Sequence, residues 1–113
     1  MGQQFMYPSE KLNDARRALM APHGRGEAAS FASAFELCDR AFHHLDLESV
    51  DDPNVIAKIE TIRRSMDTTG LEDNTGQGLW MIKADKMSYE EKVEFSNAVD
   101  DLASWLDMKF YTI

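Results

Sequence analysis

One histidine and three carboxylates recur at helical spacing in the first half of the 113-residue chain. Glu36, Asp39, His43 and Asp46 are three, four and three residues apart, so a helix would place them on one face. An imidazole with several carboxylate oxygens can bind a divalent metal ion. However, the spacing matches no zinc signature, HExxH is absent, and a solvated helix face with incidental charge pairs has the same pattern. We therefore keep the four residues as a weak candidate set and predict neither a resident metal nor a cofactor.

Cys38 is the single cysteine, so it cannot form a disulfide within the chain. It lies between Phe35 and Phe42 in an apolar stripe, which predicts burial instead of the exposed, electropositive surroundings that a nucleophilic thiol needs. A free cysteine also favours a reducing compartment, and we expect a cytoplasmic protein. No set of residues predicts a catalytic centre.

The glycine-rich stretch of residues 70–78 is the other place where binding chemistry is conceivable. Gly70 and Gly76 are one residue too far apart for a phosphate-binding loop, and no lysine follows. The acidic residues nearby do not fall at the positions of an EF-hand. We therefore expect a mobile surface turn.

A row of carboxylates near the C-terminus offers a different kind of site. Glu90, Glu94 and Asp101 lie four and seven residues apart, on the face of a predicted helix opposite its apolar stripe. Tyr89 and Trp105 flank this row, and aromatic side chains beside charged ones are common in protein interfaces. These five residues form the predicted partner-binding surface, and the expected partner is a protein with a basic surface. A solvated helix back that keeps the protein soluble would have the same row.

The overall charge supports an acidic surface. The chain has 12 Lys and Arg against 20 Asp and Glu, a formal net charge of −8, and residues 88–107 hold six acidic side chains and one Lys. Because nucleic-acid binding depends on basic side chains that neutralise phosphates, this balance argues against a nucleic-acid partner. An apolar run such as Leu79–Ile82 is far shorter than the ~20 residues of a membrane span, and the first residues lack a secretory pattern. We expect no membrane association.

Four segments have the apolar spacing of three and four residues that is typical of amphipathic helices. We predict these helices over residues 10–21, 27–47, 53–67 and 89–108. Ser9 and Asp52 are predicted N-caps, and Ser88 with Glu91 matches a capping box. Within the third helix, Glu60 and Arg64 have the i,i+4 spacing of a favourable ion pair.

The segment between the last two helices, residues 68–87, is turn-rich and then apolar. A structureless stretch of this length is unusual in a compact domain, so we expect its apolar part to pack as a short strand or a turn of helix. The predicted fold is one domain over residues 1–113, all-α, a compact four-helix bundle with an irregular insertion at about 68–87. The alternative is an α+β fold with a small hairpin around Leu79–Lys83.

These observations lead to three functional hypotheses. We expect a small acidic interaction or regulatory protein without enzymatic activity, which binds a partner protein through the acidic face of its last helix. The alternative is a helical domain that binds a small ligand or a divalent metal through the set around His43. The third hypothesis is an enzyme assembled across the subunits of an oligomer. Leu37 and Ile56 lie away from their apolar stripes, which is compatible with a homodimer.

Overall fold

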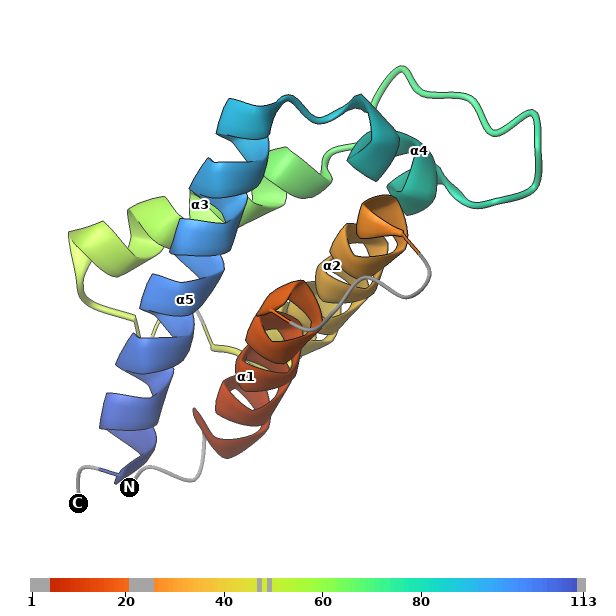
Figure 1. The fold of residues 1–113 in the computed structure, drawn as a ribbon. Helices are drawn as coiled ribbons and strands as arrows, with labels where there is room; N and C mark the ends of the chain where they lie inside the picture. Colours follow the sequence, from red (N-terminus) through yellow and green to blue (C-terminus); the bar gives the residue numbers. More distant parts are fainter. Residues whose placement is uncertain (1–4, 21–25, 47, 49, 112–113) are drawn as a thin grey trace.

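The computed structural model of the chain describes residues 5–20, 26–46, 48 and 50–111. Within them it contains five α-helices and no strand, so the predicted all-α class is confirmed and the alternative of a hairpin is wrong. The helices are α1 (Met6–Met20), α2 (Glu27–His43), α3 (Pro53–Met66), α4 (Leu79–Lys86) and α5 (Tyr89–Tyr111) (Figure 1).

The first helix begins earlier than predicted. α1 starts at Met6 and has Pro8 in its first turn, where proline is tolerated because the N–H that it lacks would have no helical partner. Ser9 therefore lies inside the helix and is not its N-cap. Its buried hydroxyl instead donates a hydrogen bond to Asp107 Oδ1 on α5, at 2.5 Å. The predicted end at Ala21 lies outside the described residues.

The second helix is shorter than predicted. α2 ends at His43, whereas the predicted end at Leu47 lies outside the described residues. Beyond the helix, the Asp46 side chain accepts the N–H of Glu48 at 3.0 Å, and a local bond of this kind offers the backbone an alternative to further helix. Leu45 is nevertheless buried, so the apolar stripe of α2 reaches the core through the turn that follows the helix.

The predicted caps of α3 and α5 are confirmed. Asp52 precedes α3 and accepts the N–H of Asn54 at 2.9 Å, with Pro53 at the first helical position. Before α5, the Ser88 N–H donates to Glu91 Oε1 at 2.9 Å, and the Ser88 hydroxyl accepts the Glu91 N–H at 3.1 Å. The hydrogen bond from the Ser88 backbone contributes most to lowering the pKa of Glu91. Both helices thus begin at positions fixed by local side chains.

The predicted insertion divides into an exposed loop and the short helix α4. α4 buries Ala84 and leaves Trp80 half-buried. In the loop before it, the Asp73 carboxylate accepts the N–H of Gly76 at 2.8 Å and of Gly78 at 2.9 Å. These hydrogen bonds lower the pKa of Asp73, and the one from Gly78 contributes most. The prediction of a mobile surface turn did not identify Asp73. Its carboxylate accepts hydrogen bonds from several backbone N–H groups of the loop.

The core is shared by the long helices. α1 packs against α2 and α5, α3 packs against α5, and α4 packs against α2 (Figure 1). The ring of Phe95 on α5 contacts those of Phe35 and Phe31 on α2, with centroids 4.9 and 5.8 Å apart. The buried apolar residues of the described chain form one cluster around this contact. None of the described helices is long and apolar enough to cross a membrane.

Candidate functional site

α5 carries the predicted partner-binding face, and α1 and α3 pack against it (Figure 1). Its outer face includes the exposed Val93, Asn97 and Ser104, none of which is charged. Cations of the neighbouring helices reach three of its carboxylates, Glu94 and Asp101 from α3 and Asp100 from α1. The acidic residues are therefore divided between a flank toward α3 and a flank toward α1.

On the flank toward α3, two of the predicted residues already have a cation of the same chain. Arg64 Nη2 lies 2.9 Å from Glu94 Oε1, and Lys58 Nζ lies 3.1 Å from Asp101 Oδ2. The predicted pairing of Arg64 with Glu60 is replaced by this contact, because a tertiary neighbour competes with the partner in its own helix. The Glu94 and Asp101 side chains remain 59% and 54% exposed, so each pair contributes only about 0–1 kcal/mol to stability.

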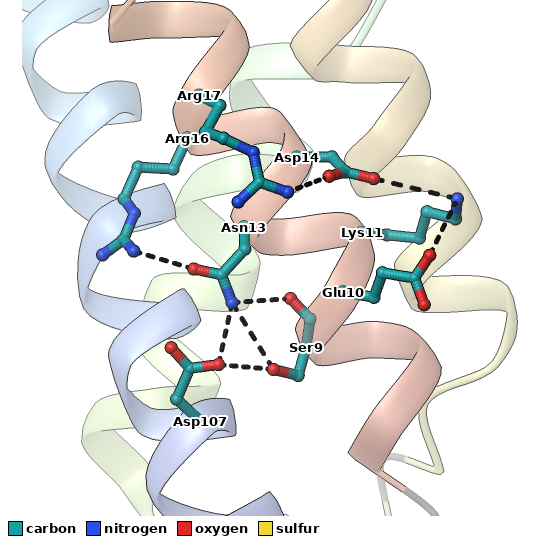
Figure 2. Close-up of polar contacts among 8 residues, drawn as sticks. All are labelled: Ser9, Glu10, Lys11, Asn13, Asp14, Arg16, Arg17 and Asp107. Carbon is teal, nitrogen blue, oxygen red and sulfur yellow. Dashed lines mark hydrogen bonds and ion pairs between the residues drawn. The ribbon is translucent and has the colours of Figure 1, made fainter.

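On the flank toward α1, Asp107 and Asp100 contact side chains of that helix. Figure 2 shows Asp107 Oδ1 accepting hydrogen bonds from the Ser9 hydroxyl at 2.5 Å and from Asn13 Nδ2 at 2.8 Å. Asn13 Oδ1 in turn accepts from Arg16 Nη2 at 2.8 Å, and Arg16 Nη1 lies 3.2 Å from Asp100 Oδ1. This polar seam is part of the packing of α1 on α5, and Asp107 is therefore not available to a partner.

The start of α5 is the part of the face that remains open. The Tyr89 side chain is 80% exposed, and Val93 one turn later is also exposed. Glu90 lies between them and has no ion pair within the described part of the chain. An aromatic ring, an aliphatic side chain and a free carboxylate are thus presented together on a helix start that the capping box fixes.

Trp105 lies far from this start. It is half-buried, its ring packs edge-to-face on Phe5 with centroids 5.7 Å apart, and Lys109 Nζ lies 5.4 Å from its ring centroid. Sixteen residues separate it from Tyr89, which is about 24 Å along a helix. The five predicted residues therefore lie along one helix but do not form one contiguous patch.

The weak metal-ligand set around His43 does not assemble. Arg40 Nη2 lies 2.7 Å from Glu36 Oε1 and forms an ion pair with it. The close contact of His43 Nδ1, at 2.8 Å, is with the backbone carbonyl oxygen of Asp39 and not with its carboxylate. Asp46 lies beyond the end of α2, where its side chain holds a turn. No group of three or more His, Cys, Asp or Glu within the described ranges could hold a metal ion. The early end of α2 is the physical reason, since the shared helix face stops before Asp46.

Cys38 is buried in α2, as predicted. Burial raises the pKa of its thiol well above the ordinary value, and the neighbouring Asp39 carboxylate adds to the shift. The thiol is therefore protonated at neutral pH. It acts as a small core side chain.

A cleft of about 460 Å³ lies between α2, α3 and α4, and it includes two of the predicted residues. Its lining combines titratable and apolar side chains, which are Asp39, His43 and Arg63 with Phe42, Met66 and Trp80. A second cleft of about 540 Å³ shares Trp80 and is bounded by residues 77–81 and by α2. Arg63 and Trp80 were missed, because no spacing along the chain connects them to Asp39. Trp80 was the one feature of the sequence that could have indicated this cleft, because a tryptophan in a turn-rich segment needs a surface to pack on.

Comparison of the chain with protein-family models, with curated proteins and with solved structures gives no match in any of the three. Two surfaces therefore remain as candidate sites, the face of α5 and the clefts around Trp80.

Proposed function

We propose that this protein is a small non-enzymatic interaction protein, which binds a partner protein with a basic surface through the acidic face of α5. In this proposal α1, α2, α3 and α5 act as a four-helix bundle, and residues 68–87 are an insertion before its last helix. The observation that carries the proposal is the exposed start of α5, where Tyr89 is 80% exposed beside Glu90. Tyrosine supplies a large contact area at low entropic cost, and an adjacent carboxylate selects a cation.

The ion pairs toward α3 are compatible with this role because they are weak. Glu94 and Asp101 are more than half exposed, so their pairs with Arg64 and Lys58 contribute little to folding. An arginine of a partner could replace either cation, because its guanidinium can bind a carboxylate with two parallel hydrogen bonds. We therefore expect Tyr89 and Glu90 to make the first contact, and Glu94 and Asp101 to exchange their cations afterwards. Trp105 supports the far end of the helix.

The long-range field favours the same partner. The formal net charge of −8 attracts a basic surface and repels an acidic one before any contact forms. Such steering weakens as the ionic strength rises, since the Debye length falls to about 8 Å at physiological salt. We expect association to slow with added salt, while the short-range contact of Tyr89 is retained.

The test places a photo-cross-linking amino acid at position 93, beside Tyr89 and Glu90, and captures partners from cells of origin. The double variant Glu90→Lys/Glu94→Lys should abolish the cross-link. The control Glu48→Lys/Glu72→Lys makes the same change in net charge on exposed residues outside α3 and α5. It should reduce capture only slightly. Equal capture by both variants, or equal loss in both, would show that the face of α5 is not the binding surface.

Small-ligand binding is the second candidate function, and the cleft beside Trp80 is the observation that favours it. Its volume lies within the range of about 300–1,000 Å³ that ligand pockets have, and a few polar groups converge on an apolar lining. A thermal-shift screen of chelator-treated protein with divalent ions tests the metal part of this alternative. A shift with any ion would require ligands other than the set of Glu36, Asp39, His43 and Asp46.

A homodimer remains part of the proposal. Ile56 on α3 is 40% exposed, and Leu37 is packed against the core only in part. Light scattering decides this question, because a mass of 12.8 kDa corresponds to the monomer. The enzyme assembled across subunits depends on the same result, since it needs an oligomer.

A further inference from the structure

The cleft between α2, α3 and α4 contains charges that the protein does not neutralise itself. Four of the arginines that the structure describes have a carboxylate within 4 Å: Arg16, Arg17, Arg40 and Arg64. Arg63 has none among the described residues, although the chain has 20 acidic side chains against 12 basic ones. An arginine without an acid in so acidic a protein is suited to an anion that comes from outside.

The Arg63 side chain is positioned by an aromatic ring. Its guanidinium carbon lies 5.3 Å from the centroid of Phe42, and both residues line the cleft. Stacking of this kind restrains the planar guanidinium without using its N–H donors. The donors stay available for a bidentate contact with a carboxylate.

The opposite charge in the cleft comes from Asp39. Its carboxylate lies 3.7 Å from His43 Nδ1, but the shorter contact of that nitrogen, at 2.8 Å, is with the Asp39 carbonyl oxygen. Because a carbonyl oxygen can only accept, the Nδ1–H of His43 is donated to the backbone. The Asp39 carboxylate has no arginine or lysine within 4 Å among the described residues. It can therefore accept a hydrogen bond from the ammonium group of a ligand.

The remaining lining is apolar. Met66 and the half-buried Trp80 contribute a thioether and an indole, which favour a flat ring. We propose that this cleft binds a small zwitterion with a flat apolar body, of which an aromatic amino acid is the simplest example. Arg63 binds its carboxylate, Asp39 binds its ammonium group, and Trp80 packs on its ring. The site uses none of the residues on the face of α5.

The test is a titration of the ¹⁵N-labelled full chain, followed by the NMR signals of its two tryptophan indoles. The probes are L-tryptophan, tryptamine, which lacks the carboxylate, and indole-3-propionate, which lacks the amine. A ligand of this size in an open cleft is expected to bind with a dissociation constant of about 1 mM or tighter. L-Tryptophan should shift the Trp80 signal saturably and leave that of Trp105 unchanged. Each truncated probe should bind at least about fivefold more weakly.

The neighbouring arginines of α3 provide a matched pair of variants. Arg63→Gln should weaken L-tryptophan binding at least about fivefold and remove its advantage over tryptamine. Arg64→Gln changes an exposed residue paired with Glu94 and should stay within about twofold of the parent chain. Asp39→Asn should remove the advantage of L-tryptophan over indole-3-propionate.

Four results would overturn the proposal. One is the absence of a saturable Trp80 shift with L-tryptophan up to about 10 mM, ten times the expected dissociation constant. Another is equal binding of all three probes, or equal shifts at both tryptophans. The last is unchanged binding in folded Arg63→Gln, with folding established from its dispersed amide spectrum.

Discussion

Three carboxylates of α5 meet cations of other helices, whereas Arg63 in the cleft has no carboxylate within 4 Å among the described residues. α5 holds six of the 20 acidic side chains of the chain, yet Glu94, Asp100 and Asp101 each pair with a basic side chain of α1 or α3. The cleft has one carboxylate, Asp39, and one guanidinium, Arg63, which do not pair with each other. The comparison indicates that a charged side chain without a partner inside the protein offers more binding energy to a ligand than a high total charge does.

The two regions share one core contact, and removing it should have the largest effect. Phe95 on α5 packs against Phe35 and Phe31 on α2, the helix that lines the cleft. Phe95→Ala should lower the free energy of unfolding by about 3–5 kcal/mol, because it leaves a cavity. Val93→Ala, a half-exposed change on the same helix, should stay within about 0.5 kcal/mol. Urea denaturation measures both, and a small loss for Phe95→Ala would contradict the view that this contact joins the two regions.

A second change tests whether the α1 flank of α5 is structural. Asp107→Ala should cost about 1–3 kcal/mol, because the Ser9 hydroxyl and the Asn13 amide lose their acceptor at the helix contact. Asp100→Ala removes only an exposed pair with Arg16 and should cost about 0–1 kcal/mol. The denaturation midpoints of the two variants give the comparison. Equal losses would contradict the division between a structural carboxylate and an exposed one.

Local signals predicted the parts of these regions that depend on adjacent residues. The caps at Asp52 and at Ser88 with Glu91 were predictable because donor and acceptor are at most three residues apart. The start of α1 was not, because Pro8 fits a first helical turn as well as the residue before a helix.

The spacing of residues along the sequence could not predict the contacts between helices. Arg64 has Glu60 at favourable helical spacing but contacts Glu94, and this choice depends on how α3 packs against α5. The cleft depends even more on tertiary structure, since Asp39, Arg63 and Trp80 belong to three helices. The sequence could show that the last helix is acidic, but it could not show which of its carboxylates are already paired.

A third experiment measures how strongly Arg64 and Glu94 interact, and so how readily a partner's arginine could replace Arg64. A double-mutant cycle with Arg64→Gln and Glu94→Gln should give a coupling energy of about 0.2–1 kcal/mol, because the pair is exposed. High salt should reduce this value. A coupling well above that range would make the exchange with a partner's arginine unfavourable, and Glu94 would then be structural like Asp107.

The smallest expected effect is confined to the loop beside the second cleft. The pKa of Asp73 is lowered from its ordinary value of 3.8, chiefly because the Gly78 N–H is donated to its carboxylate. A carboxylate with a lowered pKa stabilises the folded loop above pH 3.8, and this stabilisation is lost as the pH falls through the lower, folded-state value. The amide signals of Gly76 and Gly78 should therefore move together in acid, below the pH at which an unstructured aspartate titrates. Asp73→Asn should abolish that transition without changing the signals of the helix start at Ser88, which has its own acceptor in Glu91. Amides that titrate at or above pH 3.8 would mean that the loop is not held by Asp73, and the second cleft would then lack a fixed wall.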